Sequence, residues 1–356
     1  MPDKIKVLIV DDSALVRKII IDILGADPEI EVVGTANNGK TAIFKNKVLD
    51  PDVITMDIEM PIMNGLEALR EIIQTNPKPV IMMSVLTQDG AEPTFRALEL
   101  GAVDFIPKPS SILSITVEEI GSLLISKIKS VFKSKINIQS KPEEDDAFET
   151  VAEEREIIPE PAVSQDAGRK IVGIGTSTGG PSSLLTIFRS LPEKFPSPVL
   201  VVQHMPEGFT RAFAERLNNN SHLTVKEAED GDVVLPGCGY VAPGHSHILL
   251  EKSSTGMIIR TSKGEKISGH RPSIDVLFDS IAGIYEHESV GVIMTGMGKD
   301  GSSGIMNIKN KGGRTIAQDE RTSVVYGMNR VAVEMGAVDV VVPLQDIAKK
   351  IVEYLQ

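Results

Sequence analysis

Carboxylates, a hydroxyl and an amine each stand directly after a short apolar run in the first third of the chain. They belong to Asp11, Asp12, Asp57, Ser84 and Lys108. Clustered carboxylates repel one another unless a cation or a proton neutralises them, and oxygen-only ligands suit Mg²⁺ together with phosphate oxygens. A carboxylate in such a site can attack phosphorus and form an acyl phosphate. In that chemistry Lys108 balances the phosphoryl charge, and Ser84 donates a hydrogen bond to a phosphoryl oxygen.

These acidic residues also have a simpler interpretation, as N-caps of the helices that follow the strands. Asp12, for example, could cap a helix that begins near Ser13. Capping explains any one of these residues as well as metal binding does. It does not explain why the whole set stands at successive strand ends, so the set favours a site for Mg²⁺ and a phosphoryl group.

A serine follows a glycine-rich apolar run in the second half of the chain. The stretch from Gly175 to Gly179 has the pattern G-x-S-x-G around Ser177, which is typical of a serine exposed on a sharp strand-to-helix turn. A phosphate-binding turn is the alternative, because Gly173 extends the pattern to one residue more than the dinucleotide fingerprint. That fingerprint requires an acidic residue after the next strand, where this chain has His204.

Two further residues complete a candidate triad. A serine hydroxyl needs a base, and His204, at the end of the next parallel strand, is the expected base for Ser177. Asp300 follows a glycine-rich strand end and is the expected partner of the imidazole, although it could instead cap a helix that begins near Ser302. The backbone N–H of Met297, or of a neighbour, is a candidate donor to an oxyanion.

Three other histidines stand near these stretches. His245 and His247 could place two imidazoles on one strand face as a metal pair, but no nearby Cys or Glu completes a ligand set. His270 belongs to a loop that could line the pocket around the serine.

Two parallel β-sheets flanked by helices would bring these residues together. Apolar runs alternate with amphipathic stretches on both sides of an acidic segment, which predicts two doubly wound α/β domains. In the first, the expected strands are Ile5–Val10, Ile30–Gly34, Val53–Met56, Val80–Met83 and Val103–Ile106, and the expected helices are Ala14–Leu24, Gly39–Lys47, Gly65–Gln74, Ala91–Leu100 and Thr116–Phe132. In the second, the expected strands are Ile171–Gly175, Val199–Gln203, Val290–Thr295, Arg314–Ala317 and Val338–Val342.

The stretch 223–262 differs from the rest of the second domain. Its short β-rich runs, broken by Pro and Gly, predict an antiparallel β insertion or an edge extension of the sheet. The runs are Val233–Leu235, Tyr240–Ala242, His247–Leu250 and Met257–Arg260.

The acidic segment 141–166 carries ten acidic and two basic side chains and contains three prolines. It has little apolar surface to offset the cost of ordering, so we expect an extended linker, with a short helix around Ala147–Ile158 as the alternative. The expected domains are therefore 1–133 and 168–356, joined by the linker 134–167.

Composition excludes several classes of protein. Aromatic residues are only 4% of the chain, and no region is basic overall, which argues against a nucleic-acid-binding surface. A single cysteine, Cys238, excludes an internal disulfide framework and a multi-cysteine metal cluster. Neither a signal peptide nor a membrane-spanning run is visible, so we expect a cytoplasmic protein.

The first domain resembles a response-regulator receiver. The resemblance rests on the Asp11-Asp12 pair, the run from Met56 to Pro61, Ser84 and the Lys108-Pro109 pair. It implies a flavodoxin-like fold and phosphorylation of Asp57 by a partner histidine kinase. It also implies Mg²⁺ held by the side chains of Asp11, Asp12 and Asp57 and the backbone carbonyl of Glu59. Phe105 falls where receivers have an aromatic switch residue, although simple core packing explains it too.

The second domain resembles the chemotaxis protein-glutamate methylesterase (CheB) family. The resemblance rests on the order Ser177, His204, Asp300, which no α/β-hydrolase has, and on the motifs Thr176–Gly180, Gln203–Met205, His270–Ser273 and Thr295–Gly301. It implies a Rossmann-like domain whose serine triad, without a cofactor, removes methyl esters from glutamate side chains of chemoreceptors and releases methanol, and also deamidates certain receptor glutamines. Thr176 departs from the family, which commonly has alanine or serine before the nucleophile.

Regulation is expected to follow from the pairing of the two domains. In this hypothesis the unphosphorylated receiver covers the Ser177 pocket until phosphate on Asp57 releases it. The rival hypothesis is a response regulator with a binding output, such as a transcription factor or a small-ligand module. A DNA-binding output should show a helix-turn-helix and a basic surface, whereas residues 167–356 carry as many acidic as basic side chains.

Overall fold

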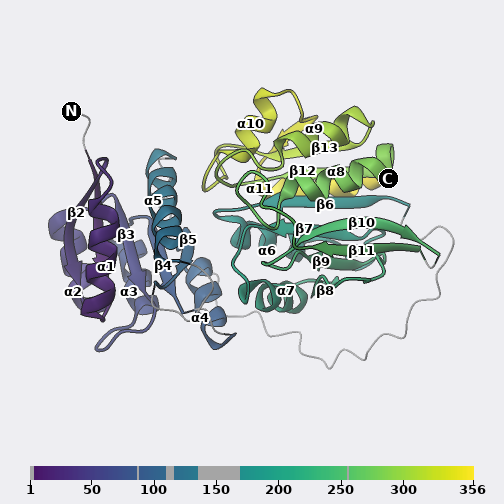
Figure 1. The fold of residues 1–356 in the computed structure, drawn as a ribbon. Helices are drawn as coiled ribbons and strands as arrows, with labels where there is room; N and C mark the ends of the chain where they lie inside the picture. The colour runs from purple at the N-terminus through teal and green to yellow at the C-terminus, as the bar shows by residue number, and fades with distance from the viewer. Residues whose placement is uncertain (1–3, 86–87, 110–115, 135–168, 255) are drawn as a thin grey trace. The chain divides into compact units, whose positions relative to one another are not determined.

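The computed structural model describes residues 4–85, 88–109, 116–134, 169–254 and 256–356. The contacts divide the chain into two compact units, Met1–Glu143 and Glu144–Gln356, which Figure 1 colours from purple to blue and from teal to yellow. Apart from Ser134, the predicted linker 134–167 lies outside the described residues, as does the helix considered around Ala147–Ile158.

The first unit is a five-stranded sheet with helices between its strands. Its strands lie in the order β2-β1-β3-β4-β5, and every neighbouring pair is parallel. The predicted doubly wound receiver fold is therefore confirmed. The elements are β1 (Ile5–Val10), α1 (Ala14–Gly25), β2 (Ile30–Ala36), α2 (Gly39–Leu49), β3 (Val53–Asp57), α3 (Gly65–Thr75), β4 (Val80–Ser84), α4 (Gln88–Glu99), β5 (Asp104–Pro107) and α5 (Val117–Lys133).

Short polar side chains start the helices of this unit. Ser13 caps α1 by accepting a hydrogen bond from the backbone N–H of Val16, so the interpretation of Asp12 as that cap is wrong. At α3, Asn64 and Glu67 form a capping box in which each side chain accepts from the other's backbone N–H. Because Asp12 is not needed as a cap, its carboxylate remains available for another role.

Strand order also explains why the carboxylates of the first unit meet. β1 lies between β2 and β3, so the chain reverses its direction of travel across the sheet at the β1–β3 pair. In open parallel sheets the crevice for a ligand opens at the carboxyl ends of the strands at such a reversal. Asp11 directly follows β1, and Asp57 ends β3.

The second unit contains a seven-stranded sheet in the order β14-β13-β12-β6-β7-β9-β8, in which every pair is parallel. Its reversal point is the β6–β12 pair, with β7 on the other side of β6. The elements are β6 (Ile171–Thr176), α6 (Gly180–Ser190), β7 (Val199–Gln203), α7 (Phe209–Asn219), β8 (Thr224–Glu227), β9 (Cys238–Val241), β10 (His247–Ser253), β11 (Gly256–Ser262), α8 (Ile274–Tyr285), a 3₁₀ turn (Glu286–Glu288), β12 (Ser289–Ile293), α9 (Ser302–Asn310), β13 (Arg314–Gln318), α10 (Met328–Glu334), β14 (Val340–Val342) and α11 (Leu344–Leu355).

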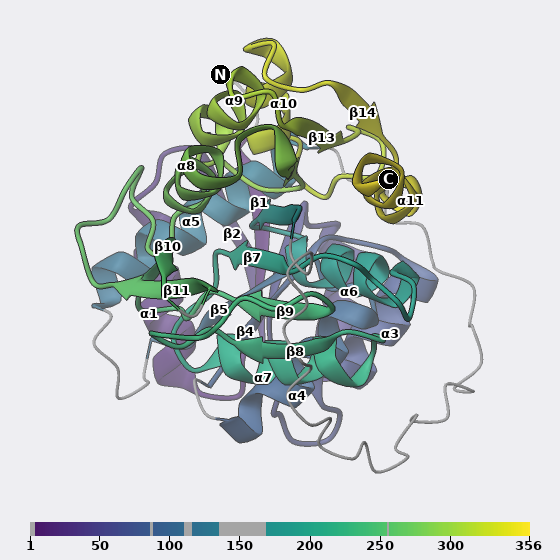
Figure 2. The same cartoon turned by 90° about the vertical axis from the view of Figure 1, so that its right-hand side faces the viewer.

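The stretch 223–262 contains both of the predicted alternatives, an antiparallel insertion and an extension of the sheet edge. β10 and β11 do form an antiparallel hairpin, but β8 and β9 extend the main sheet in parallel, next to β7 (Figure 2). The predicted run Val233–Leu235 is not a strand and contributes one isolated bridge, from Val233 to Ile258. Four-residue strands are too short for periodicity to be read reliably, and periodicity does not distinguish parallel from antiparallel pairing.

Glycines begin the two helices that follow β6 and β12. Gly179 precedes α6 with φ 78°, and Gly301 precedes α9 with φ 88°; neither helix has a side-chain cap of its own. Both backbones are in the left-handed region that favours glycine. The chain can therefore turn sharply after each strand and keep the next residues at the sheet edge.

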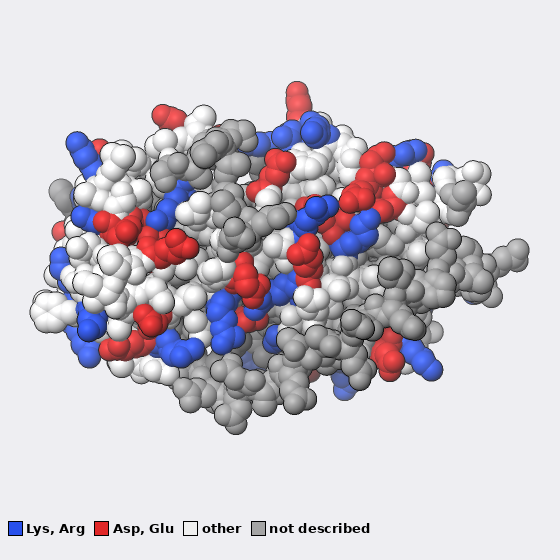
Figure 3. Space-filling view, turned by 90° about the horizontal axis from the view of Figure 1, so that it is seen from below, with Lys and Arg blue, Asp and Glu red and all other residues white. Residues whose placement is uncertain are grey.

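The hydropathy of the helices and the distribution of surface charge agree with what the amino-acid composition predicts. None of the helices in the described ranges is both long and apolar enough to span a bilayer. On the face drawn in Figure 3, acidic and basic side chains are interspersed rather than gathered by sign.

Candidate active site

The predicted carboxylate cluster forms at the β1–β3 edge. Asp11, Asp12 and Asp57 each offer one oxygen, and these atoms lie within 4.8 Å of one another. Asp11 and Asp57 are buried, whereas Asp12 is exposed. The Lys108 Nζ lies 2.7 Å from Asp57 Oδ2 and 3.2 Å from Asp11 Oδ2. The cluster is therefore a set of hard oxygen ligands with the Lys108 ammonium beside it.

The charge balance of this cluster fits a divalent cation. Burial raises the pKa of Asp57 to about 6, although the Lys108 ammonium opposes the rise, and the neighbouring Asp11 adds to it. Two buried carboxylates with one ammonium leave an excess of negative charge. Mg²⁺ has the charge and the preference for oxygen that this arrangement lacks.

Ser84, Phe105 and Glu59, the other residues predicted for this site, stand at or near strand ends of the same sheet. The side-chain contacts that the structure describes for them are not with the three carboxylates. The Ser84 hydroxyl is buried and lies 2.6 Å from the Thr94 hydroxyl of α4. Phe105 on β5 is 5% exposed and is part of the core. The Glu59 backbone N–H donates to Asp57 Oδ1 at 3.4 Å, which holds the loop after β3 against the cluster.

In the second unit, Ser177 is fixed by backbone hydrogen bonds. Its N–H donates to the Thr295 carbonyl at 3.0 Å, and its own carbonyl accepts from the Gly180 N–H at 2.8 Å. The hydroxyl of Thr176 also donates to the Thr295 carbonyl, at 3.1 Å. The turn after β6 is therefore tied to the end of β12, and Ser177 is 8% exposed at that junction.

His204 and Asp300 come together as predicted. The His204 Nε2 lies 2.8 Å from Asp300 Oδ2, and the His204 N–H donates to the Thr176 carbonyl, next to Ser177. Nδ1 of His204 is buried and has no hydrogen-bond partner among the described residues. In this resting geometry the imidazole therefore offers Nδ1, rather than Nε2, to an incoming group.

The Asp300 carboxylate accepts more hydrogen bonds than the one from His204. The Ser273 hydroxyl donates to Oδ1 at 2.8 Å, and the Ile274 N–H donates to Oδ2 at 2.8 Å. Burial alone would raise its pKa, but these donors and His204 outweigh burial and hold the pKa of Asp300 at about 2. The alternative in which Asp300 caps its own helix is wrong, since Gly301 holds that position.

Gln203 joins the serine and the histidine. Its Nε2 donates to the Ser177 carbonyl at 3.0 Å and to the His204 carbonyl at 3.1 Å. The side chain is 3% exposed. One buried amide therefore sets the distance between the backbones of the two residues.

The segment that contains Met297 borders the serine closely. A Cβ at Gly296 would lie 2.8 Å from the Ser177 Cβ and 2.4 Å from the Met328 sulfur. Only glycine permits this close approach to Ser177, and Met297 is the next residue along the chain. Gly298 has φ 86°, so the backbone turns sharply at this point.

The remaining histidines separate into two groups. The His270 ring stacks on the His204 ring with centroids 3.8 Å apart and an angle of 4° between the planes, so it does line the site. His247 uses both ring nitrogens on backbone groups: Nδ1 accepts from the Ser273 N–H and Nε2 bonds the Glu265 carbonyl. His245 Nδ1 lies 2.7 Å from the Ser246 hydroxyl, and within the part of the chain that the structure describes the candidate metal ligands gather at Asp11, Asp12 and Asp57 rather than at these histidines.

Sequence patterns did not reveal every contributor to this site. The Ile274 donor is a backbone group, which has no side-chain signature. Ser273 could have been found, because a serine before an apolar run is a typical N-cap, and it caps α8.

Comparisons with known proteins agree with both halves of the chain. Residues 172–351 match the CheB methylesterase family, and residues 7–117 match the response regulator receiver domain. A Pyrococcus horikoshii protein named protein-glutamate methylesterase/protein-glutamine glutaminase is 48% identical, over 100% of this chain and 95% of its own. A Halalkalibacterium halodurans protein of the same name is 45% identical over 99% of each chain.

A solved structure resembles the second unit. The crystal structure of the Thermotoga maritima CheB methylesterase catalytic domain is 48% identical, covers 54% of this chain and 99% of that one, and superposes with a TM-score of 0.51. Family and fold thus agree over the same residues that build the Ser177 site. The chain therefore belongs to the CheB methylesterase family, with a response regulator receiver domain ahead of its methylesterase domain.

Proposed function

We propose that this chain is a phosphorylation-regulated protein-glutamate methylesterase that acts on methylated chemoreceptors in the cytoplasm. The observation that carries the proposal is the His204–Asp300 pair at 2.8 Å, held at the strand edge next to Ser177. Family membership supplies the reaction class, and the contacts of each residue support the role that is proposed for it.

Ser177 is the nucleophile in the proposed reaction. Its Oγ attacks the carbonyl carbon of a glutamyl methyl ester while His204 takes the hydroxyl proton. The tetrahedral oxyanion is stabilised by the Met297 N–H, and loss of such a donor typically costs about 3–4 kcal/mol of barrier stabilisation. Collapse expels methoxide, which leaves as methanol after taking the proton from His204.

Water completes the cycle. His204 removes a proton from a water molecule while the water oxygen attacks the acyl-enzyme ester. His204 then returns that proton to Ser177 Oγ as the acyl–oxygen bond breaks, which releases the glutamate side chain and free Ser177. The same acyl chemistry converts a glutamine side chain to glutamate, with ammonia in place of methanol as the leaving group. The second activity in the name of the relatives, protein-glutamine glutaminase, is in this way consistent with one site.

The tautomer of His204 follows from its contacts. Asp300 is ionised over the physiological range because its pKa lies at about 2, so it can only accept a hydrogen bond. Nε2 must then carry the proton, and Nδ1 must be the basic nitrogen. This agrees with Nδ1 having no partner among the described residues, although Ser177 must still close on it when substrate binds.

In the receiver, Asp57 is proposed to accept the phosphoryl group from a chemotaxis histidine kinase. Asp11, Asp12, Asp57 and the Glu59 backbone carbonyl would hold Mg²⁺, which neutralises the carboxylates and the phosphoryl oxygens when bound. Lys108, at 2.7 Å from Asp57, would pair with a phosphoryl oxygen. Ser84 would exchange its contact with Thr94 for the phosphoryl group, and Phe105 would follow as the switch residue.

The assay that tests the esterase function is methanol release from receptor membranes with methylated glutamates. The full chain, with acetyl phosphate as phosphodonor, is compared with Ser177→Ala. Because triad members act as a unit, the variant should lose essentially all turnover above background. Ser190→Ala, at the exposed end of the same helix α6, is the matched control and should keep the parent rate.

A binding output without catalysis makes the opposite prediction. Methanol release that is the same with and without Ser177→Ala would reject the esterase proposal and favour a ligand-binding module. Labelling by a serine-directed inhibitor, mapped to the peptide that contains Ser177, gives an independent check.

A further inference from the structure

Carboxylates accept hydrogen bonds between the N-termini of α8 and α9, in addition to the Ser273 cap of α8. Asp300, just before α9, accepts from the N–H groups of Ile274 and Asp275 in the first turn of α8, at 2.8 and 3.2 Å. In return, Asp275 Oδ1 accepts from the Gly304 N–H in the first turn of α9, at 2.7 Å. The two helices thus exchange caps across their interface.

This exchange supplies what α9 lacks. The cap position of α9 is Gly301, which has no side chain and makes no side-chain cap hydrogen bond. The first N–H groups of a helix need acceptors, and Asp275 from the neighbouring helix provides one. Asp300 could not provide it, because its oxygens already face α8 and His204.

The interface leaves the first turn of α9 little room to move. A Cβ at Gly304 would lie 2.6 Å from the Phe278 Cβ and 3.0 Å from the Asp275 carbonyl oxygen. A Cβ at Gly301 would lie 2.6 Å from the Ile274 Cγ2. The two first turns are therefore in direct contact, and a shift of α9 would move Asp300 relative to His204.

We propose that Asp275 is a positioning residue for the methylesterase reaction, which anchors the first turn of α9 and thereby holds the Asp300 carboxylate on His204. The proposal rests on the proposed function, in which Asp300 orients the base. Asp275 acts through α9 and Asp300 and does not touch the imidazole in any described contact.

The surroundings of the Asp275 carboxylate make its ionised form unfavourable. Burial raises the pKa of Asp275 to about 6; the Gly304 and Gly301 N–H groups oppose the rise, and the Asp300 and Asp279 carboxylates add to it. A partly buried acid beside two other acids destabilises the fold unless its contacts compensate. The hydrogen bond to α9 offsets part of this cost, and the pKa of Asp275 still lies above the ordinary value.

The test compares two substitutions of Asp275 in the full chain with acetyl phosphate. Asp275→Ala removes the acceptor and should lower kcat for methanol release by about 10- to 100-fold, because a misplacement of about 1 Å costs that much, with KM within about twofold of the parent. Asp275→Asn keeps one acceptor oxygen, and since Asn and Asp are equivalent caps it should recover kcat to within about threefold.

A spectroscopic readout separates positioning from a general loss of structure. The proton shared by His204 Nε2 and Asp300 should give a far-downfield ¹H resonance in the parent and in Asp275→Asn, and it should be broadened or lost in Asp275→Ala. This resonance depends on the His204–Asp300 geometry and not on the identity of the substrate. A failure of the esterase assignment would therefore leave it unchanged.

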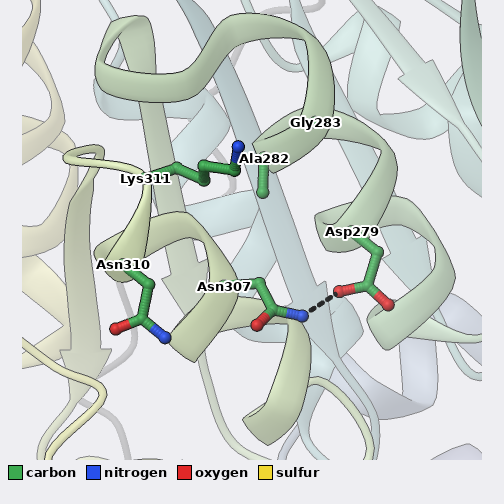
Figure 4. Close-up of a pocket in the computed structure, with 6 residues that line it drawn as sticks. All are labelled: Asp279, Ala282, Gly283, Asn307, Asn310 and Lys311. Atoms are coloured by element: carbon green, nitrogen blue, oxygen red, sulfur yellow. Dashed lines mark hydrogen bonds between the residues drawn. The ribbon is translucent and has the colours of Figure 1, made fainter.

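Asp279→Asn is the matched control. Asp279 lies one turn further along α8 and also contacts α9, by accepting from Asn307 Nδ2 at 2.7 Å beside the shallow pocket of Figure 4. It should leave both kcat and the resonance unchanged. Parent-like kcat and resonance in a folded Asp275→Ala protein would overturn the proposal, as would equal losses in the Ala and Asn variants.

Discussion

Asp57 and Asp300 are both buried carboxylates at a reversal point of a parallel sheet, yet their pKa values lie on opposite sides of the ordinary value. Burial acts in the same direction on both. Asp300 receives donors from His204, Ser273 and Ile274, which outweigh burial. Asp57 shares one ammonium with a second carboxylate, so burial prevails. The charge of Asp300 is thus compensated by its own donors, while the charge of Asp57 is not.

This imbalance predicts that Asp57 destabilises the receiver when it is ionised. Its pKa is about 6 in the folded chain and about 3.9 when unfolded, so the folded state binds more protons between these values. Stability should therefore fall as pH rises from about 4 to beyond 6. Asp57→Asn should raise the free energy of unfolding of a receiver fragment, residues 1–134, by about 1–2 kcal/mol at pH 7.5 in EDTA, measured by urea denaturation.

Two further measurements on the same receiver fragment serve as controls. At pH 4 the parent and Asp57→Asn should differ little, because Asp57 is then protonated in the folded state. Added Mg²⁺ should stabilise the parent but not the variant, which lacks one ligand. An Asp57→Asn fragment less stable than the parent at pH 7.5 in EDTA would show that the ion pair with Lys108 outweighs burial.

At the scale of elements, the strand ends were predictable and the contacts between helices were not. Because all sheet pairs among these strands are parallel, a residue directly after a buried run falls on the same edge, and Ser177 and His204 were found on that basis. Asp300 was found in the glycine-rich stretch that follows β12 at this edge. Whether Asp300 caps its own helix or the neighbouring one depends on how α8 packs on α9. The local sequence does not determine how these helices pack. It also does not determine that β9 pairs in parallel with its neighbours.

The first turn of α6 gives a test at this scale. A Cβ at Gly180 would lie 2.0 Å from Gln203 Oε1 and 2.4 Å from Thr176 Oγ1. Gly180→Ala should therefore displace the amide that joins the Ser177 and His204 carbonyls. We expect kcat to fall by about 100-fold and the free energy of unfolding to fall by about 1–3 kcal/mol, measured by methanol release and thermal denaturation.

Gly283 in α8 provides the comparison for that substitution. A Cβ there would meet nothing within 4 Å, and alanine is the better helix former. Gly283→Ala should stabilise the protein by up to about 1 kcal/mol and leave turnover unchanged. Full activity in Gly180→Ala would mean that Gln203 is not needed to space the two catalytic candidates.

At the scale of the whole molecule, each unit builds its site from its own residues. Every hydrogen bond described for Ser177, His204 and Asp300 comes from residues of the second unit. The carboxylate cluster with Lys108 is likewise contained in the first. Because these described hydrogen bonds stay within the second unit, we expect the receiver to regulate the site by restraining access or geometry rather than by completing the chemistry.

Removal of the receiver should therefore activate the enzyme. A fragment of residues 167–356 should release methanol faster than the unphosphorylated full chain, by about 5- to 150-fold, the range of typical coupling free energies, and at least as fast as the chain treated with acetyl phosphate. Full-length Asp57→Ala should stay at the low rate with or without acetyl phosphate. That result would show that activation by acetyl phosphate depends on the Asp57 carboxylate. If the folded fragment only equals the unphosphorylated chain, the receiver exerts no restraint. If it is inactive, the second unit needs the first to complete its site, and the self-contained triad described here is insufficient for turnover.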